Sequence, residues 1–244
     1  MIRLLAVLPC LLLLLATAAS ADLVVRKAYY RDTNLSLHLF VQNKGTAPVT
    51  PLPPVVNGFD TGKLGRDGKT PGPVLWYRYW PKSVRAGETS DLTITLAAPP
   101  TTPIRVEIPS PSGRPVTRTV PCNPEPLRFR AIRFSGDLRT VYVYLHWTDA
   151  TQQDGIRTLS MDGSVIAKSG SDNTNGLGYL RIALDKPLVK GSFHLFEATT
   201  ESGLSTAYQI RAIPAEFIIG TYGTNSPQNI ADWAAHGCNH YLSF

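Results

Sequence analysis

The stretch LSLHLFVQNKG, residues 35–45, alternates apolar and polar side chains and ends in a turn-forming Asn-Lys-Gly triplet. Its apolar residues occupy every second position, which places them on one face of an extended strand. The same alternation returns at residues 92–96 and 104–108. Alternation bounded by Gly, Pro and Asn is typical of half-buried antiparallel strands. About five to seven such strands within residues 22–120 predict a β-sandwich of the immunoglobulin type.

The pattern starts again after a proline-rich stretch, PCNPEP at residues 121–126. Three prolines in six residues do not fit a central strand, and they stiffen a linker. Within residues 127–213, the run VYVYLHW (141–147) places four apolar residues on one face and Tyr142, Tyr144 and His146 on the other. We therefore expect a second immunoglobulin-like sandwich over residues 127–213, in which residues 169–178 form a long polar loop.

The composition fits a chain made of short strands. Of 244 residues, 43% are hydrophobic and only 17% are charged, against about 25% charged in an average soluble chain. With 19 glycines and 20 prolines, a helical bundle is disfavoured. Aromatic and β-branched residues are spread along the chain, which argues against disorder. Length alone allows one or two domains.

The first 21 residues have the layout of a secretory signal peptide. Arg3 is followed by an apolar run from Leu4 to Ala16 and by Ala19-Ser20-Ala21, a small-x-small cleavage signature. The run is too short for a membrane span, and no later segment approaches that length. We expect cleavage before Asp22, a secreted or periplasmic protein, and no membrane span after cleavage. In an oxidising compartment the remaining cysteines, Cys122 and Cys238, are able to pair, but the sequence leaves open whether they do.

Residues 214–244 change character. The apolar run at 217–223 reads as a strand buried on both faces. Ser226 and Pro227 then form a helix start, and Gly237 a helix stop. Residues 239–244 read as another strand. Strand, helix, strand is the beginning of a parallel α/β unit, which needs further strands and helices to cover it. The sequence thus predicts an incomplete α/β segment, and a chain that is the first part of a larger protein or a truncated product.

This segment resembles the entry of a (β/α)8 barrel of the glycoside-hydrolase type. The resemblance lies in FIIGTYG at residues 217–223 and DWAAHGCN at 232–239, and the β-sandwiches ahead of a barrel are similar in arrangement. Cys238 departs from the pattern, because the family usually has a bulky apolar residue there. The resemblance implies that the two catalytic carboxylates belong to later barrel strands, so it assigns no catalytic residue to this chain. Whether the chain belongs to an enzyme stays open.

The densest chemical feature is the run Trp76-Tyr77-Arg78-Tyr79-Trp80. On a strand, Trp76, Arg78 and Trp80 share one face, and the two tyrosines share the other. If exposed, this aromatic-Arg-aromatic row would stack on sugar rings and bind their hydroxyls. Alternatively, one face is core and Arg78 stacks over the indoles.

Tyr142 and Tyr144 share one face of a strand in the second sandwich. They either bind a ligand there or pack against side chains of the neighbouring strands. These residues and the Trp76–Trp80 row are the candidate ligand-binding set.

Other motifs favour ordinary structure over chemistry. His236 and His240 flank Cys238, but Gly237 interrupts the helix that would align the two imidazoles, so no metal site is predicted. The loop at residues 60–68 lacks oxygen ligands where calcium would need them. We expect no cofactor.

The basic excess, a net charge of +6 with Arg128, Arg130, Arg133 and Arg139 close together, would suit an anionic polysaccharide. Nucleic acid does not fit an exported protein, and a solvated strand face is the simplest interpretation.

Three functions compete. The first is a non-catalytic, exported pair of sandwich modules in a carbohydrate-active, glycoside-hydrolase-like protein. The second is a stand-alone extracellular polysaccharide-binding protein. The third is a periplasmic two-domain chaperone, which the α/β segment at residues 214–244 disfavours.

Overall fold

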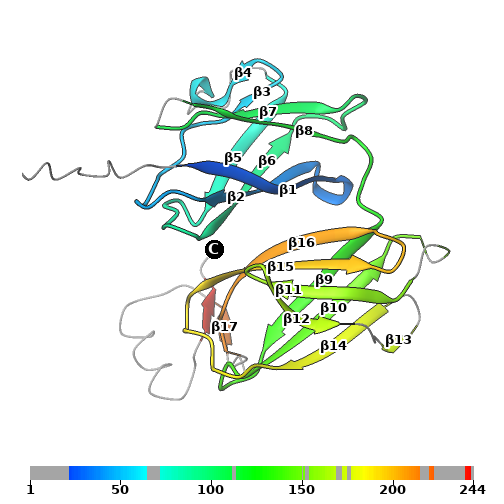
Figure 1. Cartoon of the computed structure of the whole chain (residues 1–244). Coiled ribbons are helices and arrows are strands. Elements are labelled where there is room, and N and C mark those ends of the chain that lie inside the picture. The colour runs from blue at the N-terminus through cyan, green and yellow to red at the C-terminus, as the bar shows by residue number, and fades with distance from the viewer. Residues whose placement is uncertain are drawn as a thin grey trace, which may run out of the picture.

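The computed structural model describes residues 22–64, 72–111, 114–149, 151, 154–168, 172–174, 177–214, 220–222 and 240–242. The predicted signal peptide lies outside these residues. The described chain is mainly β and forms two sandwiches, which lie one above the other in Figure 1. Its described helices are two short 3₁₀ turns, η1 (Asp32–Asn34) and η2 (Thr61–Lys63). None of the helices in the described part of the chain is long and apolar enough to cross a membrane.

The first sandwich consists of eight strands in two four-stranded sheets. They are β1 (Leu23–Arg31), β2 (Ser36–Asn43), β3 (Val55–Val56), β4 (Phe59–Asp60), β5 (Val74–Trp80), β6 (Thr89–Leu96), β7 (Ile104–Ile108) and β8 (Val116–Val120). One sheet has the order β1-β2-β6-β5 and the other β4-β3-β7-β8. This is the ABED and C′CFG arrangement of an immunoglobulin-like domain.

The second sandwich repeats the same arrangement. Its strands are β9 (Leu127–Phe134), β10 (Thr140–Trp147), β11 (Ile156–Met161), β12 (Ser164–Lys168), β13 (Asp172–Thr174), β14 (Leu177–Ala183), β15 (Phe193–Thr200) and β16 (Ser205–Arg211). The sheets are β13-β14-β10-β9 and β12-β11-β15-β16. The predicted mainly β, immunoglobulin-like fold is confirmed by this strand order.

Each sandwich has its own core, on the faces that the alternation predicts. Leu37, Leu39 and Val41 are fully buried in the first core. The apolar face of the run at residues 141–147 is buried in the second core, with Trp147 2% exposed. Two local details differ from the prediction. Leu35 lies outside β2 in a left-handed conformation (φ 50°), where it ends η1, and the predicted loop at residues 169–178 contains β13, which pairs with β14.

The C-terminal segment contains two further strands, β17 (Gly220–Tyr222) and β18 (His240–Leu242). They pair in parallel, with Gly220 opposite His240. Parallel neighbours need a crossover connection of about a dozen residues or more, and residues 223–239 are long enough for one. The helix predicted there lies outside the described residues.

Candidate ligand-binding groove between the two sandwiches

The two sandwiches dock through the outer faces of two sheets. In Figure 1, β1 and β2 of the first sandwich face β15 and β16 of the second. Tyr29 and Phe40 on the first side meet Leu195 and Ala207 on the second, and the four form a buried apolar cluster separate from both cores. Phe40 has no exposed surface at all. The interface therefore has an apolar centre, like a small core of its own.

Polar contacts between the sandwiches fix how they meet. The Gln209 amide nitrogen on β16 donates to the carbonyls of Trp80, at 2.9 Å, and of Thr89, at 2.8 Å. Arg26 on β1 forms an ion pair with Glu197 on β15 at 3.0 Å. Because Gln209 binds two carbonyls at once, a sliding or rotation of one sheet over the other would break both bonds.

A buried carboxyl in the proline-rich stretch contacts both sandwiches. Glu125 Oε2 accepts a hydrogen bond from Thr206 Oγ1 on β16 at 3.0 Å. Its Oε1 lies 3.4 Å from Lys27 Nζ on β1. Burial raises the pKa of Glu125 to about 7, although Lys27 and the Thr206 hydroxyl act in the opposite direction. This group therefore titrates near neutral pH, at the point where the two sandwiches are joined.

Beside the apolar cluster, the interface opens into a cavity of about 670 Å³, which we call the groove. One wall is the outer face of β2, β6 and β5, and the other is β16. Its lining residues are Arg31, Asn34, His38, Trp76, Arg78, Trp80, Asp91, Thr93, Thr95, Tyr208, Gln209, Ile210 and Arg211. The structure thus places all three residues of the predicted aromatic-Arg-aromatic row on one wall of this cavity.

The row forms a ladder in which the guanidinium lies between two indoles. The Arg78 Cζ atom is 5.9 Å from the ring centroid of Trp76 and 5.6 Å from that of Trp80. The indoles remain 45% and 48% exposed. On the opposite face, Tyr79 is buried and its hydroxyl donates to the Leu52 carbonyl at 3.1 Å. The tyrosine face packs on the core and Arg78 stacks over the indoles, as the packing interpretation predicts, while the Trp-Arg-Trp face stays open to the groove.

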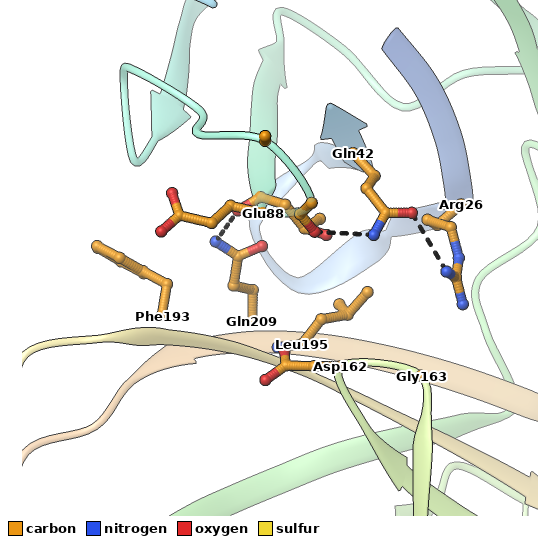
Figure 2. Close-up of a pocket in the computed structure, with 11 residues that line it drawn as sticks. Arg26, Gln42, Glu88, Asp162, Gly163, Phe193, Leu195 and Gln209 are labelled. Carbon is orange, nitrogen blue, oxygen red and sulfur yellow. Dashed lines mark hydrogen bonds between the residues drawn. The ribbon is translucent and has the colours of Figure 1, made fainter. Parts of the chain in front are cut away.

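A second cavity, of about 210 Å³, lies on the other side of Gln209. Figure 2 shows that Arg26, Gln42 and Glu88 reach into it from the first sandwich, and Phe193, Leu195 and Gln209 from the second. The Trp80 ring packs edge-on against Phe193 with centroids 5.6 Å apart. Gln209 lines both cavities, and Trp80 of the groove contacts Phe193 of the second cavity.

Two groove residues, His38 and Asp91, form with the buried Ser36 an array that looks like a hydrolase triad. Ser36 Oγ lies 3.0 Å from His38 Nε2, and His38 Nδ1 lies 3.1 Å from Asp91 Oδ2. However, Ser36 has no exposed surface, and its hydroxyl donates to Asn34 Oδ1 at 2.6 Å. A nucleophile must be reached by substrate and must give its proton to the histidine. Here the hydroxyl is buried and gives its proton to Asn34, so the array is structural.

The second sandwich contains a Ser-His-Asp array with the same order of contacts. Ser192 Oγ lies 2.6 Å from His194 Nε2, and His194 Nδ1 lies 2.7 Å from Asp162 Oδ2. The one proton of the Ser192 hydroxyl is donated to the Val189 carbonyl at 2.6 Å. The Ser192 hydroxyl therefore does not give its proton to the histidine. Repetition of this arrangement away from the groove also favours a structural role.

The other predicted residues, Tyr142 and Tyr144, lie elsewhere. They belong to β10, in the sheet β13-β14-β10-β9, whereas the groove is bounded by β16 of the opposite sheet. Tyr142 is half-buried between Arg133 and Arg181 on the neighbouring strands. The structure does not bring these tyrosines to the Trp-Arg-Trp ladder.

Within the described residues, no group of three or more metal-ligating side chains comes together. The loop that begins at Asp60 uses this carboxylate to cap η2, accepting from the Gly62 amide at 2.9 Å. The side chains of His236, Cys238 and His240 lie outside the described part of the chain. Cys122 is a half-buried free thiol.

Several groove residues have no signature in the sequence. Arg31, His38, Asp91, Gln209 and Arg211 come from four strands of two sandwiches. One signal was available, since the face of β2 opposite the core carries Ser36, His38 and Phe40 without the charges expected of a solvated strand. An uncharged outer face indicates that something covers it.

Comparison with known proteins finds structural neighbours with low TM-scores. No protein-family model and no curated protein matches it. Among solved structures, the tandem Ig repeats of Dlar are 11% identical over 81% of this chain and 99% of that chain, with a TM-score of 0.32. The archaellum periplasmic stator protein FlaG from Sulfolobus acidocaldarius is 19% identical over 41% of this chain and 99% of that chain, with a TM-score of 0.33. The YadV chaperone is 13% identical over 79% and 99%, with a TM-score of 0.24. Because these TM-scores are low, the assignment of the fold rests on the strand order of this chain itself.

Proposed function

We propose that the chain is an exported, non-catalytic pair of immunoglobulin-like modules that binds polysaccharide in the groove between them. One observation carries the proposal. Trp76 and Trp80, each nearly half exposed and held by Arg78, face a cavity of about 670 Å³.

The size and lining of the groove suit a sugar chain. Ligand sites typically enclose about 300–1,000 Å³ and combine flat apolar groups with a few polar ones. Indole rings offer flat apolar surfaces for the faces of pyranose rings, and the indole N–H is a hydrogen-bond donor at the ring edge. Thr93, Thr95 and Asn34 on the same walls offer hydroxyl and amide groups for sugar hydroxyls.

The test is binding to a panel of soluble polysaccharides, by affinity electrophoresis and titration calorimetry. Trp76→Ala removes one exposed face of the ladder without touching the interface, and we expect it to weaken binding about tenfold or more. Trp80→Ala is less informative, because that ring also packs on Phe193. The matched control is the double variant Tyr142→Ala, Tyr144→Ala on β10, which should bind like the parent. Full binding by the Trp76 variant, with loss in the double tyrosine variant, would move the site to the second sandwich.

A second proposal concerns residues 214–244. The parallel pairing of β17 with β18 supports the strand-crossover-strand unit with which a (β/α)8 barrel begins. On this proposal the sandwiches are the sugar-binding modules of a carbohydrate-active protein, and the groove contributes affinity, not chemistry. As a stand-alone binding protein the chain would use the same groove. In either case the Trp76 experiment tests the groove itself.

A further inference from the structure

We infer that the groove selects acidic polysaccharides, whose sugars carry carboxylates, over neutral ones. This inference rests on the proposed function, because it names the class of polysaccharide that the same groove takes. It follows from three guanidinium groups that line the groove: Arg31, Arg78 and Arg211.

None of these three arginines forms an ion pair with a carboxylate in the described part of the chain. Other interface arginines do pair, as Arg26 does with Glu197 and Arg128 with Asp32 at 2.7 Å. A set of unpaired cations along one cavity is therefore a property of the groove and not of the interface in general.

Uncharged neighbours hold each of the three in place. Arg31 lies over the Tyr29 ring at 5.6 Å and donates to its hydroxyl at 3.2 Å. Arg78 lies between the two indoles. Arg211 Nε donates to the Gly191 carbonyl at 3.0 Å, which leaves its terminal nitrogens for other partners. Guanidinium groups fixed in this way bind an anion with less loss of side-chain entropy.

The acid in the groove does not cancel this charge. Asp91 is the carboxylate on the groove walls, and both its oxygens lie within 3.2 Å of His38 Nδ1. The His38 ring in turn stacks on Tyr29, with centroids 5.2 Å apart. The remaining field in the groove is positive, and a concave, low-dielectric wall concentrates it.

Carboxylate-bearing sugars match this mixture better than a phosphate polymer does. Arginine binds a planar carboxylate with two parallel hydrogen bonds. A hydroxyl-rich ring also uses the neutral groups and the indole faces. Arginine binds phosphate in the same way, so the contacts of the sugar ring with the indole faces and the neutral groups are what favour an acidic polysaccharide.

The experiment compares acids with their own neutral esters. The probes are polygalacturonate and alginate, each as the free acid salt and as the fully methyl-esterified polymer, with binding measured at low and high salt. We expect at least one acid to bind about tenfold or more tightly than its ester, and this difference to shrink at high salt. Arg31→Gln and Arg211→Gln should each weaken binding of the acid about tenfold, and should weaken binding of the ester much less. Arg118→Gln, at an exposed position of β8 outside the groove lining, removes the same charge and should change neither.

The outcomes separate the two proposals. If the parent protein binds acid and ester equally, or binds only neutral polysaccharides in a Trp76-dependent way, the inference is overturned and the proposed function stands. If it binds no polysaccharide at all, the proposed function itself fails. If single-stranded DNA displaces the acidic polysaccharide at equal charge concentration, the groove recognises negative charge alone. Selection of acidic sugars is then overturned.

Discussion

Replacement of Glu125 by Gln should remove a pH dependence from the stability of the two-sandwich unit. The Glu125 carboxyl is buried where β1, β16 and the proline-rich stretch meet, and Thr206 donates to it at 3.0 Å. Gln has nearly the same shape and keeps an oxygen that accepts this bond. The substitution therefore tests the charge while leaving the packing in place.

The size of the effect follows from the pKa. Burial raises the pKa of Glu125 from its ordinary value of 4.5 to about 7. In the folded protein the carboxyl thus keeps its proton up to about pH 7, whereas in the unfolded chain it loses it near pH 4.5. The folded state holds more protons in this window, so the contribution is fully present below pH 4.5 and is lost as the pH rises through 7. At 1.36 kcal/mol per pH unit, the free energy of unfolding falls by about 3 kcal/mol across the window.

The assay is urea unfolding of the parent and of Glu125→Gln, followed by tryptophan fluorescence at several pH values between 5 and 8 and at constant ionic strength. We expect the parent to lose about 2–3 kcal/mol over this range relative to the variant. The difference between the two proteins removes the titration of all other groups. A difference that stays constant from pH 5 to 8 would refute the raised pKa, and with it the claim that the carboxyl is desolvated between the sandwiches.

Three further outcomes are expected. Phe40→Ala leaves a hole in the interface cluster and should cost about 3 kcal/mol or more in urea unfolding, whereas Leu75→Ala, at a position 62% exposed, should cost under about 0.5 kcal/mol; equal effects would contradict the buried interface. Ser36→Ala should lower stability by about 1 kcal/mol. Neither it nor the parent should turn over nitrophenyl esters or glycosides, and turnover that depends on Ser36 would restore the triad interpretation. Mass spectrometry of exported protein should find Asp22 as the first residue, and a retained Met1 would contradict cleavage.

The sequence predicts the two cores well, because a core needs only local alternation. Leu37, Leu39 and Val41 face inward on β2 for the same reason that every second residue of any strand does. The sequence also carries two hairpin signals. Asn57-Gly58 joins β3 to β4, and Asp162-Gly163 joins β11 to β12, each with both residues at positive φ. These dipeptides favour the tight turns of two-residue hairpins, and they identify the C-C′ hairpin of each sandwich.

The sequence predicts one wall of the groove and not the other. The Trp76–Trp80 row is visible because its members are neighbours on one strand. Its opposite wall is not, because Gln209 and Arg211 reach it only when the second sandwich docks on the first. Docking depends on complementary outer faces, and alternation within a strand carries no information about which faces meet. The Ser-His-Asp arrays were hidden for a different reason, since Asp91 meets His38 through the pairing of strands 53 positions apart within one sandwich.

The burial of β2 indicates that the groove is formed before any ligand arrives. Seven of its eight residues are buried, from both faces of the strand. The inner face meets the first core, and the outer face meets Leu195 and Ala207 of the second sandwich. Separation of the sandwiches would expose Phe40 and break both bonds of Gln209, so a hinge that opens widely is disfavoured. A preformed groove binds without the free-energy cost of ordering two domains. On this reasoning, the affinity for a sugar chain depends on the Trp-Arg-Trp ladder and its facing arginines, and not on closure of the domains around the ligand.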